Sequence, residues 1–252
     1  MSNHQRGIQT VEFAGEILQL VCSSSRSLSL SEIAEKMQLA PGSAYKYLLS
    51  LLRTGLLKRN ENTLEFEPGP LSLRLGLAKI NHDSLLKSAR EFLSQLGDQY
   101  QVNIFASMWS KSNGPTVVFY KQAGGFFHIG FRLGIQLSLQ HTASGRLFAA
   151  YLDRSFLEDF YPNLSDVEQK ELKSTDFQST LSQIKQQGYS HLVGSPTPGI
   201  SSFSVPVVND TGEFLMAITA FQSSENMTLE REQQLIFGLK NIAMTLKEQQ
   251  HG

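Results

Sequence analysis

The chain has 252 residues, of which 40% are hydrophobic and 18% charged, and its formal net charge is −1. This composition supports a packed core and excludes an intrinsically disordered chain, while the length allows one large domain or two of ordinary size. A net charge near zero gives no general sign of a polyanionic partner, so local charge has to be examined.

Cysteine content and the length of apolar runs indicate the cellular compartment of the protein. A single cysteine, Cys22, excludes an internal disulfide and a cysteine metal cluster, which fits a reducing compartment. No apolar run approaches the roughly 18 residues of a membrane span. The sequence therefore indicates a cytoplasmic protein with no membrane partner, in which Cys22 is expected to be a small buried residue of the first helix.

Three helices are predicted near the start of the chain. Apolar residues at helical spacing predict the first over residues 8–24. Ser29 and Glu32 have the spacing of a capping box, which predicts that a second helix begins there. Pro41 suits the first turn of a third helix, and Gly55 suits the position just after its end.

A hairpin follows the third helix. Residues 56–59 and 64–67 are predicted to be short strands joined by a polar turn. Helix, helix, turn, helix and hairpin is the order of a winged helix-turn-helix. Gly69 and Pro70 then break the chain, and residues 71–80 are expected to form a linker helix.

Positive charge is concentrated on the third helix and the first strand. Residues 41–60 contain four lysines or arginines and no acid. The major groove of DNA admits one helix, whose N-terminal residues read base edges while cations bind phosphates. We predict that the start of this helix faces the DNA bases and that three of the four cations bind the phosphate backbone of the DNA. The predicted DNA-binding residues are Pro41, Gly42, Ser43, Tyr45, Lys46, Arg53, Lys58 and Arg59.

A plain helical bundle with a solvated basic face is the alternative for one amphipathic helix. The ordered set of cap, short turn, third helix and basic hairpin favours double-stranded DNA as the partner. A two-fold symmetric dimer would then bind a palindromic operator.

The second half of the chain is predicted to be an α+β domain with a central antiparallel sheet. Alternating apolar residues indicate strands over residues 102–109, 116–122, 126–132, 203–208 and 214–221. Helical periodicity indicates helices over residues 83–100, 142–152, 165–172, 177–187 and 229–249. Such domains often hold a ligand between the sheet and its covering loops.

Several motifs resemble a known family. The segment SLSEIAEKMQLAPGSAYKYLLSLLRTGLLKRNENTLEFEPGPLSLRLG resembles the DNA-binding domain and linker of IclR-type transcription regulators, with Gly69-Pro70 and the leucines after it matching the linker. Further on, Thr142-Ala143-Ser144-Gly145-Arg146, Pro198-Gly199-Ile200 and Val205-Pro206-Val207 resemble stretches of the family's effector domain. The resemblance covers about residues 8–248.

The resemblance implies the whole architecture. Residues 1–68 would be the winged helix-turn-helix, residues 69–81 a linker helix, and residues 82–252 a GAF-like α/β effector-binding domain. It also implies homodimers or homotetramers, control of nearby genes by a small-molecule effector, and no cofactor. The positions matched to the family's effector site are Phe126, Ile129, Ala143, Ser144, Leu192, Ser202, Thr219 and Phe221.

Departures from the family pattern suggest the class of effector. Leu192 and Phe221 stand where regulators of small polar acids often have an acidic residue and a small hydroxyl residue. The pocket is therefore expected to be apolar and to take a carboxylate or hydroxylated ligand with an apolar or aromatic body. The nearby cationic candidates are His128, Arg132, His141 and Arg146.

The sequence also bears on two rival functions. An enzyme is disfavoured, because no histidine pair has metal-ligand spacing and neither a nucleophile elbow nor a phosphate-binding loop is present. A winged helix used for protein contacts, with a sensory domain that has lost its ligand, stays open. In that case Phe126 and Phe221 would fill the pocket themselves.

Overall fold

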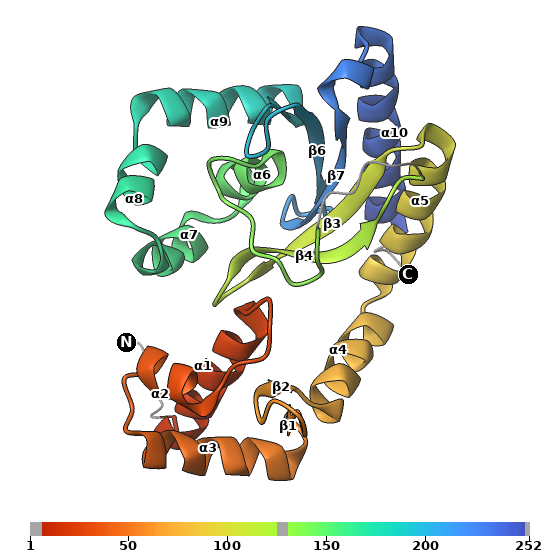
Figure 1. Cartoon of the computed structure of the whole chain (residues 1–252). Helices are drawn as coiled ribbons and strands as arrows, with labels where there is room; N and C mark the ends of the chain where they lie inside the picture. The colour runs from red at the N-terminus through yellow and green to blue at the C-terminus, as the bar shows by residue number, and fades with distance from the viewer. Residues whose placement is uncertain (1–6, 125–130, 250–252) are drawn as a thin grey trace. The chain divides into compact units, whose positions relative to one another are not determined.

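The computed structural model describes residues 7–124 and 131–249 and forms two compact units, one ending at Asp83 and the other beginning at Ser84 (Figure 1). The two units have separate apolar cores.

The N-terminal unit has the predicted winged helix-turn-helix order. The hairpin strands pair antiparallel, and Leu28 adds a bridge to Phe66 on the second strand. Its elements are α1 (Gln9–Ser23), α2 (Leu30–Lys36), α3 (Pro41–Thr54), β1 (Leu57–Arg59), β2 (Phe66–Pro68) and α4 (Pro70–His82).

Local signals in the sequence fix the helix ends of this unit. The Ser29 hydroxyl accepts from the Glu32 amide while the Glu32 carboxylate accepts from the Ser29 amide, so the predicted capping box is confirmed. Gly55 ends α3 with φ +77°, a left-handed conformation that glycine adopts without strain. Pro41 occupies the first turn of α3, as predicted.

One prediction in this unit is wrong. Cys22 is exposed, although burial was expected from its place in the first helix. The buried residues of α1 are Ile17 and Val21, which lie one helical turn apart and face the core. Cys22 follows Val21 by one residue and is therefore rotated by about 100° around the helix, away from that core.

The hairpin turn is longer than the sequence suggested. Leu64 has φ +60° and its amide donates to the Asn60 carbonyl at 2.9 Å, so the turn includes it. The second strand consequently begins at Phe66 rather than at Leu64. The Asn60 side chain accepts from the amides of Asn62 and Thr63 and holds the turn together.

The C-terminal unit contains a five-stranded antiparallel sheet in the order β4-β3-β7-β6-β5. Its strands are β3 (Asn103–Ser110), β4 (Gly114–Lys121), β5 (Ser190–Val193), β6 (Ile200–Val208) and β7 (Phe214–Ser223). Its α-helices are α5 (Ser84–Tyr100), α6 (Ala143–Tyr151), α7 (Arg154–Phe160), α8 (Asp166–Leu172), α9 (Thr175–Gln187) and α10 (Leu229–Glu248).

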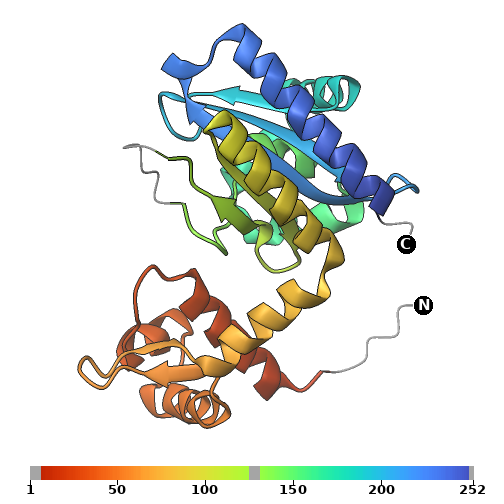
Figure 2. The same cartoon turned by 90° about the vertical axis from the view of Figure 1, so that its right-hand side faces the viewer.

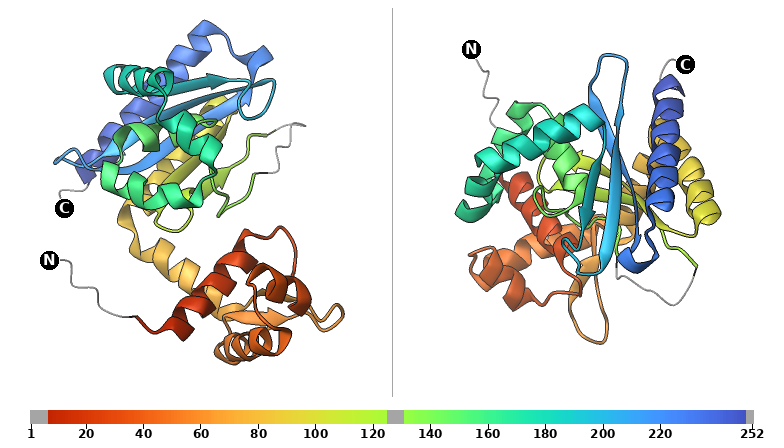
Figure 3. Two further views of the ribbon diagram at one scale, coloured as in Figure 1. Left: turned by 90° about the vertical axis from the view of Figure 1, so that its left-hand side faces the viewer. Right: turned by 90° about the horizontal axis from the view of Figure 1, so that it is seen from above.

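Helices cover both faces of this sheet. The long helices α5 and α10 lie side by side on one face, and α6 lies on the other (Figures 1 and 2). Helices α7, α8 and α9 surround α6 on that second side, as the view from above shows (Figure 3). Each face has its own apolar cluster. One includes Leu93 of α5 and Leu239 of α10, and the other includes Phe148 of α6 and Phe160 of α7.

Two short elements escaped the sequence analysis. Helix α7 and strand β5 span only seven and four residues, too few for a clear period. The strand predicted over residues 126–132 falls mostly outside the described residues. Phe131 and Arg132, which are described, do not belong to a strand.

Candidate functional site

The first candidate surface is the outer face of α3. Its inner face packs Ala44, Leu48 and Leu51 into the core, which turns the opposite side to solvent. All eight residues predicted to bind DNA are exposed, and Tyr45 keeps 43% of its surface accessible. The predicted residues are thus available on one helix and the strand after it.

Gly42 lies in the first turn of this helix. A Cβ atom added there would meet nothing within 4 Å in the protein. The glycine is therefore not required by packing or by a positive φ. Its lack of a side chain leaves the backbone of the helix start open to an external partner.

The cations of this unit differ in their surroundings. Lys58 pairs with Glu67 at 3.0 Å across the hairpin. Arg59 donates to the Leu64 carbonyl at 2.9 Å and lies over the Phe66 ring, contacts that support the turn. Within the part of the chain that the structure describes, no ion pair engages Lys46 or Arg53.

The second candidate site is a cavity of about 410 Å³ in the C-terminal unit. It lies on the α6 side of the sheet, and two loops complete it. Its walls are Phe105, Phe131, Ile135, Gln136, Leu137, Ser138, Thr142, Ala143, Ser195, Pro196, Thr197, Ile200, Ser202, Thr219 and Phe221. None of these described wall residues carries a charge, so the cavity offers rings, aliphatic groups and hydroxyls.

Four of the predicted effector residues meet in this cavity. Ala143, Ser202, Thr219 and Phe221 belong to its wall. The Thr219 hydroxyl also bonds to the Ser204 hydroxyl at 2.8 Å, which anchors it to the neighbouring strand.

Of the other four, only Ser144 and Leu192 are described, and neither belongs to the wall. The Ser144 hydroxyl is fully buried and bonds to Ser107 at 2.7 Å, between α6 and the sheet. Leu192 lies on β5 and is absent from the wall, although its carbonyl accepts from the Ser202 hydroxyl. Phe126 and Ile129 lie outside the described residues.

An aromatic cluster in the wall was largely missed by sequence reasoning. The Phe221 ring lies 5.9 Å from that of Phe105 and 5.5 Å from that of Phe131, and Tyr120 stacks on Phe221 at 6.3 Å. Phe105 was detectable as an apolar position on a predicted strand. Its meeting with Phe221 depends on the pairing of β3 with β7, which one sequence does not reveal.

The first turn of α6 forms another part of the wall. The Thr142 hydroxyl accepts from the Gly145 amide at 2.9 Å and donates to the Ser138 carbonyl at 2.7 Å. A Cβ atom on Gly145 would lie 1.9 Å from that carbonyl oxygen. Gly145 therefore allows the loop to cross tightly over the helix start, which places Ser138 and Ala143 in the wall.

The cationic residues considered from the sequence lie elsewhere or outside the described residues. Arg146 donates to the Gln140 carbonyl at 2.7 Å and lies over the Phe177 ring, where burial lowers the pKa of its guanidinium. His141 faces Glu171 at 3.7 Å. Arg132 is not in the wall, and His128 is outside the described residues.

One group of side chains in the C-terminal unit resembles the catalytic set of an enzyme. His191 lies 3.1 Å from the Ser201 hydroxyl and 3.3 Å from Glu232, an order of contacts like that of a hydrolase triad. Ser201 is only 1% exposed and belongs to the wall of none of the three cavities found in the described part of this unit, so a substrate has no access to it. Across residues 7–124 and 131–249, no cluster of three metal-ligating side chains occurs and no helix could cross a membrane.

Comparison with known proteins agrees with this architecture. A family model for the IclR helix-turn-helix domain matches residues 10–61, and one described as "Bacterial transcriptional regulator IclR C-terminal" matches residues 78–247. The HTH-type transcriptional regulator BhcR of Paracoccus denitrificans is 26% identical over 222 residues, which is 84% of this chain and 77% of BhcR.

Two further relatives lead to the same family. The glycerol operon regulatory protein of Streptomyces coelicolor is 25% identical over 80% of both chains. An IclR-type transcriptional regulator of Alicyclobacillus acidocaldarius shares the fold with a TM-score of 0.82, at 20% identity over 96% of this chain and 99% of that one. These relatives are transcription regulators and not enzymes. This chain belongs to the IclR family of bacterial transcriptional regulators, which bind DNA.

Proposed function

We propose that this protein is a sequence-specific regulator in which α3 enters the major groove of its operator and a small molecule in the 410 Å³ cavity modulates DNA binding. The observation that carries the proposal is the outer face of α3. It is exposed, free of acids, and begins with an open glycine followed by Ser43, Tyr45 and Lys46.

The contacts with DNA would divide by position on this face. Ser43, Tyr45 and Lys46 lie in the first half of α3, which is the part of a recognition helix that approaches base edges. Arg53 at the end of α3 and the two cations of β1 would hold phosphates and fix the register. Lys58 would have to leave Glu67 to do so, so Arg53 is expected to contribute more.

A symmetric dimer is proposed to present two such faces. Helix α4 buries none of its own residues in this chain and exposes Leu73 and Leu77, which are one turn apart. Exposed apolar side chains at this spacing suit contact with a second copy. A dimer formed in this way would bind a palindromic operator.

The cavity suits an effector with a flat apolar body and one polar end. The body would pack against Phe105, Phe131 and Phe221, which provide ring faces and edges. The polar end would meet the start of α6, where the Thr142 hydroxyl caps the Gly145 amide and the amides of Ala143 and Ser144 have no helical partner, so that the first turn favours an anion. Because no described wall residue is charged, hydroxyls such as that of Ser138 would complete the recognition.

Removal of the Lys46 ammonium tests the DNA-binding part directly. Lys46→Ala should weaken binding to the preferred operator by about 1–3 kcal/mol if Lys46 contacts a base, with a smaller loss on random DNA. The measurement is a mobility shift on both DNAs at two salt concentrations. The matched control is Lys36→Ala, which removes an exposed lysine at the end of α2. Equal binding by Lys46→Ala and the control would refute the assignment.

A further inference from the structure

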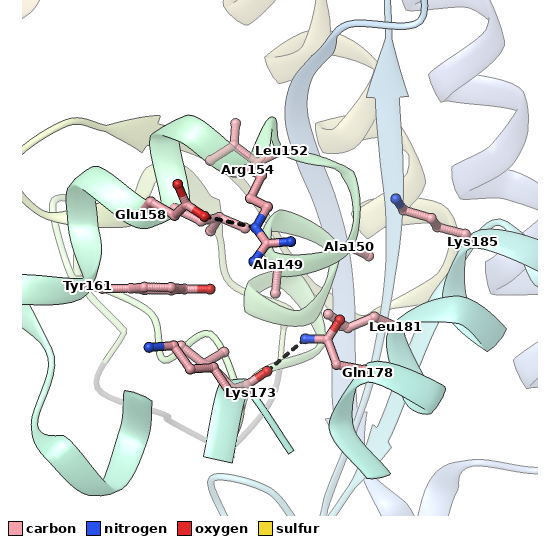
Figure 4. A pocket seen from close by; sticks show the side chains of 12 residues that line it. Ala149, Ala150, Leu152, Arg154, Glu158, Tyr161, Lys173, Gln178, Leu181 and Lys185 are labelled. Atoms are coloured by element: carbon pink, nitrogen blue, oxygen red, sulfur yellow. Dashed lines mark hydrogen bonds and ion pairs between the residues drawn. The ribbon is translucent and has the colours of Figure 1, made fainter. Parts of the chain in front are cut away.

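A second cavity in the C-terminal unit lies apart from the proposed effector site. It measures about 650 Å³ and shares no wall residue with the 410 Å³ cavity. It lies among α6, α7, α8 and α9, on the side of α6 away from its first turn. Figure 4 shows the side chains around it.

The floor of this cavity is apolar. Ala149 and Ala150 of α6 form its base, and Leu157, Leu172 and Leu181 approach from the three surrounding helices. The three leucines are buried members of the core on this side of the sheet. The floor is therefore fixed by packing rather than by mobile surface chains.

The rim is positively charged. Arg154, Lys173 and Lys185 stand around the opening, against a single carboxylate, that of Glu158 (Figure 4). Glu158 already pairs with Arg154 at 2.8 Å. Among the described residues, Lys185 has no ion-pair partner, so its ammonium remains to meet a negative charge.

Two further groups on the rim suit an organic ligand. The Tyr161 ring presents a face over which the Lys173 ammonium lies at 5.2 Å from the ring centre. The Gln178 amide nitrogen is held by the Leu172 carbonyl at 2.7 Å, which leaves the amide oxygen as an acceptor. A ligand could thus combine ring contact, one hydrogen bond and ion pairs.

We infer that this cavity is a second binding site, for a small organic anion whose apolar body lies on the leucine floor and whose carboxylate or phosphate pairs with Lys185, which stands at the opposite end of the cavity from Lys173 (Figure 4). The charge of the rim selects the anion, and the floor selects against a purely hydrated ion. The volume is within the range of small-molecule sites.

The test is a calorimetric titration of the full-length protein in phosphate-free buffer at low salt. Phenyl phosphate is the probe, and benzoate and neutral benzyl alcohol are the comparison compounds. The double variant Lys173→Gln with Lys185→Gln should weaken phenyl phosphate binding about tenfold, because the charge-assisted contact with Lys185 and the positive charge of the rim are lost. The matched control is Lys87→Gln with Lys111→Gln, the same charge change at two exposed lysines of this unit outside the cavity. Both pairs are exposed, and unchanged melting temperatures would show that the fold is retained.

Retained affinity in the control and weakened affinity in the cavity variant support the site. Comparison of phenyl phosphate with benzoate shows which anionic group is preferred. Because phenyl phosphate also belongs to the ligand class proposed for the other cavity, the lysine substitutions are compared in the Ser202→Phe background, where that cavity is filled and the tenfold loss should persist. Absence of binding to the natural chain, equal binding by the Lys173/Lys185 variant, or equally tight binding of benzyl alcohol would overturn the inference.

Discussion

The two candidate sites are built in opposite ways. The face proposed to bind DNA is one side of a single helix and the strand that follows it, so its residues lie within about twenty positions of one another. The 410 Å³ cavity combines Phe105 of β3, Thr142 before α6, the loop at Ser195 and Phe221 of β7, which are up to 116 residues apart. A site on one helix is encoded locally, while a site between a sheet and loops is encoded by the topology.

This difference has a consequence for mutations. A substitution on the outer face of α3 should affect DNA binding without disturbing the fold, because the face is not packed. Changes around the cavity should affect stability and ligand binding together, because its wall residues are also core residues.

The largest effect is expected at the crossing over α6. Gly145→Ala would place a methyl group against the Ser138 carbonyl, which is backbone and cannot move without shifting the loop. We expect a loss of about 3 kcal/mol from the free energy of unfolding, measured by chemical denaturation. Gly15→Ala is the control, since a Cβ atom there meets nothing within 4 Å. Equal stability of the two variants would contradict the tight crossing.

The next effect concerns a half-buried wall position, where ligand binding should change more than stability. Ser202→Phe adds a ring to a half-buried wall position and should fill much of the 410 Å³ cavity. With benzoate as the probe, we expect affinity to fall about 30-fold, or about 2 kcal/mol, while binding to operator DNA without ligand is kept. Calorimetry and a mobility shift give the two readouts. Ser182→Phe, on the exposed side of α9, is the control. Unchanged benzoate affinity in Ser202→Phe would place the ligand elsewhere.

A smaller effect is expected at the start of α3. Gly42→Ala should stabilise the free helix by up to about 1 kcal/mol, because alanine favours helix and the protein leaves space for the methyl group. If the helix start approaches DNA closely, the same variant should bind its operator about tenfold more weakly, which corresponds to about 1.4 kcal/mol. Thermal melting and a mobility shift would show these opposite signs. Improved stability with undiminished DNA binding would mean that the glycine does not face the groove.

The smallest effect is a pH dependence at the cap of α2. The side chain of Arg26 and the amide and hydroxyl of Ser29 lower the pKa of Glu32 from 4.5 to about 2. Because the folded-state pKa is the lower one, ionised Glu32 stabilises the folded state above about pH 4.5, and this contribution is lost as the pH falls toward 2. The difference in melting temperature between the natural chain and Glu32→Gln should therefore shrink from pH 5 to pH 2. A difference independent of pH would show that the carboxylate charge plays no part.

Most of the fold could be predicted from the sequence because the signals that determine its elements are local. The Ser29 capping box, Pro41 at the start of α3 and Gly55 after it each require only neighbouring residues. The error at Cys22 arose because one position along a helix changes the side that a residue faces. Strand β5 was missed because an edge strand of four residues has no measurable period.

The cavity was only partly predictable for a physical reason. Ala143 and Thr219 were found through the family resemblance, and both belong to the wall. Ser144 follows Ala143 in sequence but lies on the side of α6 that faces the sheet, where it bonds to Ser107. The loop residues at Ser195 and Thr197 carry no local signal, because their role depends on where β6 begins.

The most direct test of the central claim is selection of bound sequences from a random pool of double-stranded DNA, followed by mobility shifts at two salt concentrations with the natural chain and Lys46→Ala. The account predicts a palindromic motif, a steep fall of affinity with salt, and weaker preference for the motif in the variant. Recovery of no motif, with and without a pool of metabolites, would contradict it and would favour a winged helix that contacts another protein.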